Sequence, residues 1–365
     1  MNKLERYELA RNCIVDYTDG DVTAAVLREY AVSGMYNILS CLHSLGISGE
    51  NSKLFALPDF TFSRNDNRYQ AGFPYGSIIH IDTKNTPFIP LGFRPNCCGI
   101  TMVEFSNKEN SLEKIRARIR NLGDLDTDIA SDDLSRGNHF VGIYYDSQID
   151  KSFGIIHGSF SFVKSGYRDI PGLYIDKTNY WNNKLKVFDN AEISFPYLID
   201  EAAKEYYKAY IQHEDHTKTL RAQVANHLFP DSTLLFNETH EGMFAQNTIV
   251  LGSYTASRSY SSPILLAAEA DLPILQITTP LPYLSDSIYA CPHGGGYSLQ
   301  HIEDGKFDIH NRLYHLRFRN GACMETDDVR KLIYDYRLNT DKIWADNLGF
   351  GIVQKRLKTI YNFKL

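Results

Sequence analysis

The longest periodic stretch of the sequence, from Pro196 to about Leu228, constrains the fold more than any other feature. Aromatic, apolar and small polar side chains recur there in alternating steps of four and three residues, which places them on one face of a helix. The members of this stripe are Tyr206, Tyr210, His213, Thr217, Leu220, Val224 and His227. The chain is therefore expected to contain one long helix, with the imidazole of His227 on the side that faces the core.

Shorter patterns indicate further helices and several strands. Asp21 is a suitable N-cap for a helix that ends near Gly46, and an apolar stripe predicts a second helix from Ser111 to Gly123. Because helices and strands mix without strict alternation, the predicted fold class is α+β. The remaining predictions are strands at Phe140–Tyr145 and Phe153–His157, a helix at Asp327–Tyr336 and a strand-rich end at Gly349–Phe363.

Composition limits the class of protein. The 365 residues are 43% hydrophobic and 22% charged, which is typical of a globular chain. We expect a helical N-terminal segment, residues 1–52, packed on one large domain, residues 53–365. The formal net charge of -6 excludes a generally basic surface, so any contact with nucleic acid must be local. No signal peptide or spanning helix is predicted, which favours a cytoplasmic protein without a membrane partner.

Thiol and imidazole side chains suggest a metal site. Six cysteines are too few for a disulfide framework in a chain of this length, so free thiols or a metal ligand are favoured. Transition metals take thiolate and imidazole ligands, and four such residues stand at the ends of predicted elements. They are Cys98, His139, His157 and His227. A single histidine of this kind is more often structural than a ligand, so the hypothesis depends on the whole set.

A second candidate site is the glycine-rich stretch Cys291–Gly296, which contains His293. Its three glycines could turn backbone N–H groups toward an anion, and a neutral imidazole beside them could attack phosphorus. The alternative interpretation is a flexible turn. The sequence lacks a P-loop, a convincing Rossmann glycine pattern and a G-x-S-x-G elbow, which argues against P-loop kinases, dehydrogenases and serine hydrolases.

The order of these motifs resembles that of the RtcB-type RNA ligases, from roughly Phe55 to the C-terminus. The combination of G-N-H-F, an I-H-G strand and a later C-x-H-G-G-G is more specific than any of its parts. The matching stretches are Pro58-Asp59, Cys98-Gly99, Gly137-Asn138-His139-Phe140, Ile156-His157-Gly158, Asn226-His227, Gly252-Ser253, His293-Gly294-Gly295-Gly296 and the penultimate Lys364.

The resemblance implies an activity and a role for each matching residue. Enzymes of this family join RNA ends that carry a 3′-phosphate or 2′,3′-cyclic phosphate to a 5′-hydroxyl, on tRNA-like or damaged RNA. A histidine, here His293, is first guanylylated by GTP. One or two manganese ions would be held by Cys98, His139, His157 and His227. The nucleotide would be bound by Asn138, Gly252, Ser253, Gly294, Gly295, Gly296 and Lys364.

Several family residues are replaced. Pro95 stands where the family has a metal-binding aspartate, Tyr297 replaces an arginine, and His240-Glu241-Gly242-Met243 replaces R-K-G-A. Each lost charge-assisted phosphate contact removes about 1.5–3 kcal/mol. Arg136, directly before Gly137, could supply one cation near Asn138. Two alternatives therefore stay open: a diverged RNA-binding or metal-binding protein without ligase activity, and a metal-dependent phosphoesterase.

Overall fold

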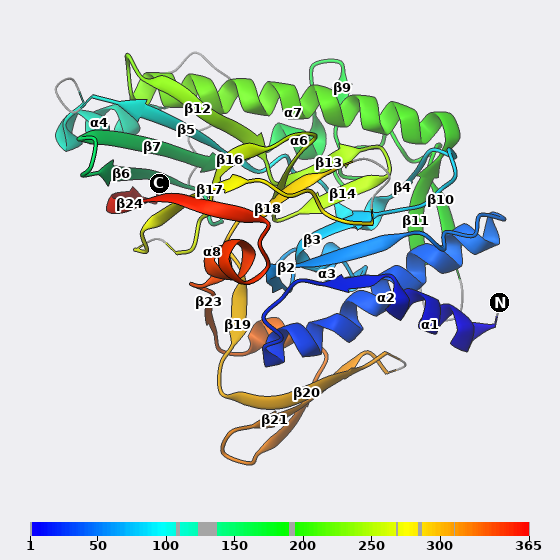
Figure 1. Ribbon diagram of the computed structural model, residues 1–365. Coiled ribbons are helices and arrows are strands. Elements are labelled where there is room, and N and C mark those ends of the chain that lie inside the picture. The colour runs from blue at the N-terminus through cyan, green and yellow to red at the C-terminus, as the bar shows by residue number, and fades with distance from the viewer. Residues whose placement is uncertain are drawn as a thin grey trace.

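The computed structural model describes residues 2–106, 110–122, 137–189, 194–267, 269–283, 287–309 and 311–364 (Figure 1). Its fold is α+β, as predicted. Among the described strand pairs, only β1 with β2 is parallel. No helix in these ranges is both long and apolar enough to cross a bilayer.

A seven-stranded antiparallel sheet carries half of the candidate site. Its strand order is β12-β5-β7-β6-β24-β17-β16. The strands are β5 (Gly99–Phe105), β6 (Phe140–Asp146), β7 (Lys151–Gly158), β12 (Thr233–Thr239), β16 (Tyr260–Pro263), β17 (Leu272–Ile277) and β24 (Gly351–Phe363). The predicted strands at β6, β7 and β24 are thereby confirmed.

The long helix α7 (Asp200–Leu228) packs across β5, β7 and β12 (Figure 1). The stripe from Tyr206 to Val224 is buried, as its period predicted. The helix begins at Asp200 and not at Pro196, because Ser194–Ile199 forms strand β11 instead. That strand pairs with β10 (Lys186–Asp189) and β4 (Phe88–Pro90), and Phe195 and Tyr197 are buried there.

A five-stranded sheet of order β1-β2-β3-β14-β13 carries the other half of the site. Its strands are β1 (Ile14–Asp16), β2 (Lys53–Thr61), β3 (Tyr75–His80), β13 (Glu241–Ala245) and β14 (Thr248–Leu251). Helices α1 (Lys3–Asn12) and α2 (Val22–Ser44) pack together beside β1 and β2. Asp21 caps α2 by accepting a hydrogen bond from the Ala24 amide, which confirms the predicted helix start. Because β1 pairs with β2, the N-terminal segment is part of this sheet.

Shorter elements lie between these strands along the chain. The short strands are β8 (Gly166–Tyr167), β9 (Ile170–Pro171), β15 (Ser253–Ala256) and β18 (Tyr289–Pro292). The short helices are α3 (Asp66–Gln70), η1 (Leu91–Phe93), α4 (Leu112–Arg120), α6 (Phe162–Ser165), α8 (Thr340–Lys342) and η4 (Ile343–Asn347). Helix α4 lies within the predicted Ser111–Gly123 helix, and Gly123 is outside the described residues.

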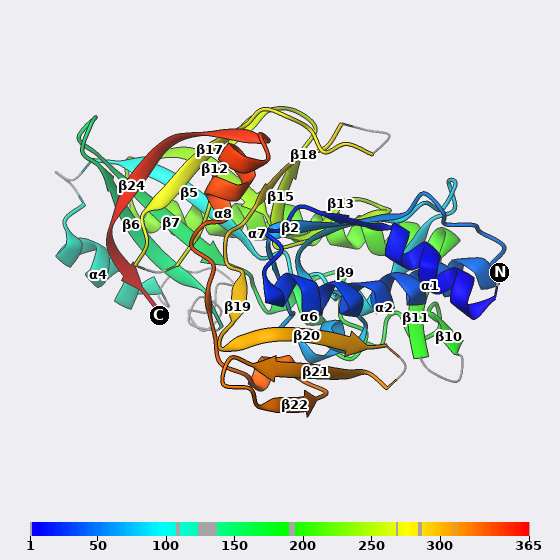
Figure 2. The ribbon, with the colours of Figure 1, turned by 60° about the horizontal axis from the view of Figure 1, so that its bottom comes forward.

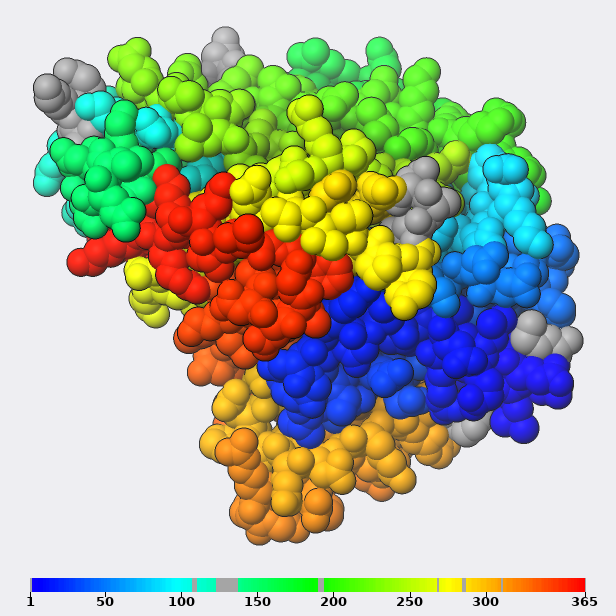
Figure 3. Space-filling model, viewed as in Figure 1, coloured from blue at the N-terminus to red at the C-terminus, as the bar shows by residue number. Residues whose placement is uncertain are grey.

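The segment after β18 forms a β-module that projects from the body of the molecule beneath α2 (Figures 2 and 3). It consists of β19 (Tyr297–Leu299), β20 (Ile302–Asp308), β21 (Leu313–Phe318), β22 (Cys323–Thr326), η3 (Val329–Lys331) and β23 (Tyr334–Tyr336). The predicted helix at Asp327–Tyr336 is therefore wrong. Only one short turn is helical, and Tyr334 and Tyr336 alternate along a strand that pairs with β19.

Candidate metal centre and adjoining cleft

Cys98 lies at the start of β5, where the chain enters the seven-stranded sheet. Its side chain is buried, and its backbone N–H donates to Asn96 Oδ1 over 2.8 Å. Residue Ile100 of β5 pairs with His157 of β7, so the two strands bring the thiol and the imidazole to one sheet edge. Cys98 Sγ lies 3.3 Å from His157 Nε2.

His139 reaches the same place from the residue before β6. Its Nε2 lies 3.6 Å from Cys98 Sγ and 3.4 Å from Ser159 Oγ. The neighbouring Asn138 carbonyl accepts a hydrogen bond from His157 Nδ1 over 3.0 Å. Because that contact fixes the proton on Nδ1, the Nε2 of His157 is left with a lone pair for a metal.

His240 completes the cluster, although the sequence did not identify it as a ligand. It follows β12, whose last residue Thr239 pairs with Gly99, and its backbone N–H donates to the Cys98 carbonyl over 2.8 Å. His240 Nε2 lies 3.4 Å from His157 Nε2, while its Nδ1 lies 3.1 Å from the Tyr254 hydroxyl. Cys98, His157 and His240 are all buried, and their ligand atoms lie within 4.8 Å of one another.

His227 is placed elsewhere. Phe229, two residues later, stacks on Phe105 at the far end of β5, with ring centroids 4.7 Å apart. Phe105 is six positions along the strand from Gly99, which corresponds to about 20 Å. The structure therefore does not bring His227 to the cluster, and His240 stands in the position expected for it. His227 is only partly buried, unlike the stripe from Tyr206 to Val224, and the helical pattern could not give its position along β5.

The protonation of the cluster suits a metal. Burial lowers the pKa of His157 and His240 well below the ordinary 6.5, and the neighbouring histidines act in the same direction. Both imidazoles are therefore neutral, the form that binds metals. Burial raises the pKa of the Cys98 thiol, so a metal that binds there must displace a proton. These residues can hold a metal ion, and one thiolate with imidazoles is a donor set that transition metals accept.

His293 lies directly beside this cluster. Its ring centroid is 4.9 Å from that of His240, and its Nδ1 lies 2.6 Å from Asp59 Oδ2. Asp59 belongs to β2 and is fully buried. A carboxylate can only accept, so Nδ1 carries the proton and Nε2 has the free lone pair. The dyad thus gives His293 the tautomer that a nucleophile requires.

The predicted glycines keep the backbone close around this dyad. The Gly294 N–H donates to Asp59 Oδ2 over 3.0 Å, and a Cβ at Gly296 would lie 2.3 Å from the Asp59 carbonyl oxygen. The Gly252 carbonyl accepts from the His293 N–H over 3.2 Å. Ser253 is buried, and its N–H donates to the His240 carbonyl over 3.3 Å. These contacts position His293 and His240 relative to each other.

A cleft of about 560 Å³ opens over His293. Of the residues predicted to bind a nucleotide, Asn138, Gly295 and Lys364 line it. The described cationic side chains on its walls are Arg64, Arg68, Lys164 and Lys364. Arg136 is outside the described residues.

Charge in the cleft is partly neutralised. Arg68 forms a buried ion pair with Glu241, and the second Glu241 oxygen accepts from the Tyr75 hydroxyl over 3.0 Å. Glu241 is therefore committed to these partners. Asn96 Oδ1, close to the replaced aspartate position at Pro95, accepts from the Cys98 backbone.

Comparison with known proteins adds no assignment. No protein-family model matches the sequence, and no curated protein is significantly similar to it.

Proposed function

We propose that the protein is a diverged, metal-dependent RNA ligase of the RtcB type, which transfers a nucleotide through His293. One observation carries the proposal: a buried thiol and imidazole cluster lies against a histidine whose Nδ1 is held by a buried aspartate. That histidine lines a cleft with several cations. This combination suits nucleophilic attack on phosphorus better than it suits a purely structural metal site.

In the proposed reaction, His293 Nε2 attacks the α-phosphorus of GTP, and pyrophosphate leaves. The guanylate then passes from the imidazole to the 3′-phosphate of an RNA end. Attack by a 5′-hydroxyl on that activated phosphate forms the new phosphodiester bond and releases GMP. Asp59 holds the His293 tautomer throughout, so that Nε2 can attack and later leave.

Cys98, His157 and His240 would hold the metal, with His139 next to them. A bound manganese ion would neutralise phosphate charge and orient the attacked phosphorus. Asn138 and Lys364 line the cleft and would contact the nucleotide. Lys164 and Arg64 also line this cleft and would supply positive charge in place of the arginines that this chain lacks.

The direct test is labelling of the protein with GTP that carries ³²P at the α-phosphate, in the presence of manganese. We expect covalent label on the wild-type chain and none on His293→Ala. Because the expected bond joins nitrogen to phosphorus, the label should be lost in acid and retained in alkali.

His301→Ala is the matched control, since His301 is an exposed histidine of the β-module and does not line the cleft. It should label like the wild-type protein. Absence of label on wild-type protein with GTP or any other nucleoside triphosphate would contradict the proposal.

A second candidate function is RNA binding without ligation. The Glu241–Arg68 ion pair favours it, because it removes one cation from the set available to phosphates. Stoichiometric bound metal together with RNA binding and no covalent label would support this alternative.

A further inference from the structure

Four aromatic rings pack against one another beside the cleft and are here called the aromatic shelf: Phe62 and Tyr297, which line the cleft, and Tyr334 and Tyr336. Tyr297 of β19 pairs with Tyr336 of β23, and their ring centroids lie 5.2 Å apart. The ring centroids of Tyr334 and Tyr297 lie 4.6 Å apart. Phe62 stacks on Tyr297 with ring centroids 5.7 Å apart and an angle of 23° between the rings. The shelf thus joins the β-module to the end of the five-stranded sheet.

Two rings of the shelf are buried in the protein interior, and a third is exposed. Phe62 and Tyr297 are buried at 1% and 8% exposure and form its base. Tyr336, in contrast, is 45% exposed. Arg64 is also exposed, and its guanidinium is hydrogen-bonded to Tyr297. An exposed ring and an exposed cation therefore stand on a rigid aromatic base.

The shelf is continuous with the catalytic cleft. Phe62, Arg64 and Tyr297 line the same cavity as His293. Three residues lie between His293 and Tyr297, which limits the distance between their Cα atoms to about 14 Å. The part of the shelf at Tyr297 is therefore within about 14 Å of His293, measured between backbone atoms.

We propose that the aromatic shelf stacks an unpaired base of the RNA end that enters the cleft. The inference rests on the proposed function and specifies its substrate as single-stranded at the joined end. Aromatic side chains stack on bases of any sequence, and an adjacent arginine adds a cation–π or phosphate contact. A duplex end keeps its bases paired and stacked, so it cannot use such a surface.

The test is RNA binding measured by fluorescence anisotropy, with a labelled single-stranded decamer that carries a 3′-phosphate. Tyr336→Leu removes the ring and keeps apolar bulk, so we expect binding to weaken by about five- to one-hundred-fold. Tyr336→Phe keeps the ring and should bind like the wild-type protein. Arg64→Ala should weaken binding as well, and more so at low salt.

Tyr180→Leu is the matched control, because Tyr180 is 46% exposed and lies outside the cleft. It should leave RNA binding unchanged. If Tyr336→Leu binds the single-stranded RNA as tightly as the wild-type protein does, the shelf proposal is overturned. It is also overturned if Tyr336→Leu weakens binding of a blunt duplex of the same sequence by the same factor as binding of the single strand. Failure of the GTP-labelling test on wild-type protein, with RNA binding still sensitive to Tyr336, would contradict the ligase proposal alone.

Discussion

His240 is the residue that separates the structure from the family pattern. It provides the third close ligand atom of the cluster, and its backbone hydrogen-bonds to Cys98. We predict that His240→Ala weakens metal binding by more than about 100-fold, because even residues that only orient a ligand contribute 10- to 100-fold. His227→Ala should retain the metal. Metal content of the two purified variants, measured by elemental mass spectrometry, checks this; equal metal loss in both would contradict the cluster described here.

Three residues of the cluster could be predicted from the sequence, and His240 could not. Cys98, His139 and His157 each stand at an element end beside a glycine, a local signal that can be recognised without a structure. His240 has no such signal, and the sequence pattern indicates it only as the replacement of an arginine. Its approach to Cys98 depends on the register in which Thr239 pairs with Gly99, and pairing register between distant strands cannot be inferred from local pattern.

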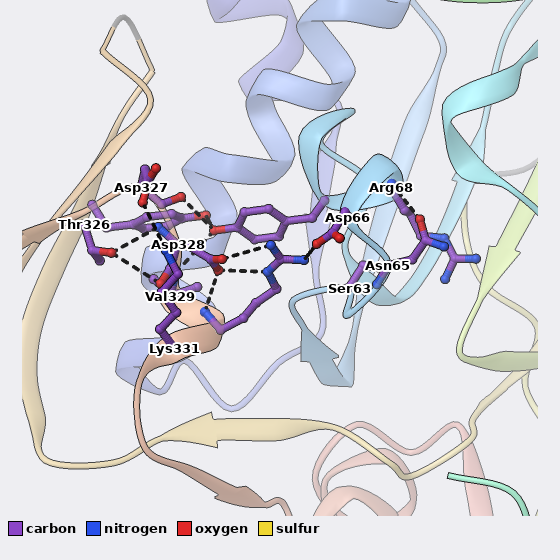
Figure 4. A network of polar contacts seen from close by, with 12 residues as sticks. Ser63, Asn65, Asp66, Arg68, Thr326, Asp327, Asp328, Val329 and Lys331 are labelled. Carbon is purple, nitrogen blue, oxygen red and sulfur yellow. Dashed lines mark hydrogen bonds and ion pairs between the residues drawn. The ribbon is translucent and has the colours of Figure 1, made fainter. Parts of the chain in front are cut away.

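At the scale of elements, the β-module is attached to the body through a polar network centred on η3 (Figure 4). Arg330 binds Asp328 at 2.8 Å and Asp66 of α3 at 2.6 Å, and its guanidinium lies 4.2 Å from the centre of the Tyr69 ring. The Tyr69 hydroxyl lies 3.2 Å from that of Tyr314 in β21. Helix α3 also carries Arg68, which lines the cleft. The network therefore links the β-module, which carries part of the shelf, to a helix that contributes to the cleft.

We predict that Arg330→Leu lowers the free energy of unfolding by about 1–3 kcal/mol, because it breaks charge-assisted bonds at a side chain that is only 17% exposed. Lys331→Leu is the control: this lysine is 71% exposed and lies 3.9 Å from Asp327, so its loss should change stability by less than about 0.5 kcal/mol. Urea unfolding followed by circular dichroism measures both. Equal effects of the two variants would show that the network does not anchor the module.

Elements with a clear local pattern were predictable, and the segment Asp327–Tyr336, whose pattern is ambiguous, was not. The period of α7 and the Asp21 cap of α2 are local properties, and both helices form as expected. Asp327–Tyr336 was predicted as a helix because its apolar residues also fit a helical spacing. The pairing of β23 with β19 decided the outcome, and that contact joins parts of the chain almost forty residues apart.

At the scale of the whole molecule, the buried histidines make stability depend on pH. Burial lowers the folded-state pKa of His157, His240 and His213, whereas unfolding returns each to about 6.5. Below that pH the unfolded chain binds more protons than the folded one, so acid favours unfolding. The carboxylates with lowered pKa values, such as Asp176 and Glu205, have ordinary values of 3.8 and 4.5 and titrate at lower pH.

The metal-free protein should therefore lose stability as the pH falls from about 7.5 to about 5.5, with a limiting slope of about 1.4 kcal/mol per pH unit for each buried histidine. Urea unfolding in the presence of EDTA measures the slope. The double variant His157→Gln, His240→Gln should retain only the part due to His213. A bound metal should steepen the loss on acidification, because protons compete with it for Cys98 and the imidazoles. A flat profile for the metal-free wild-type protein, or an unchanged slope in the double variant, would show that these histidines are not held neutral by the fold.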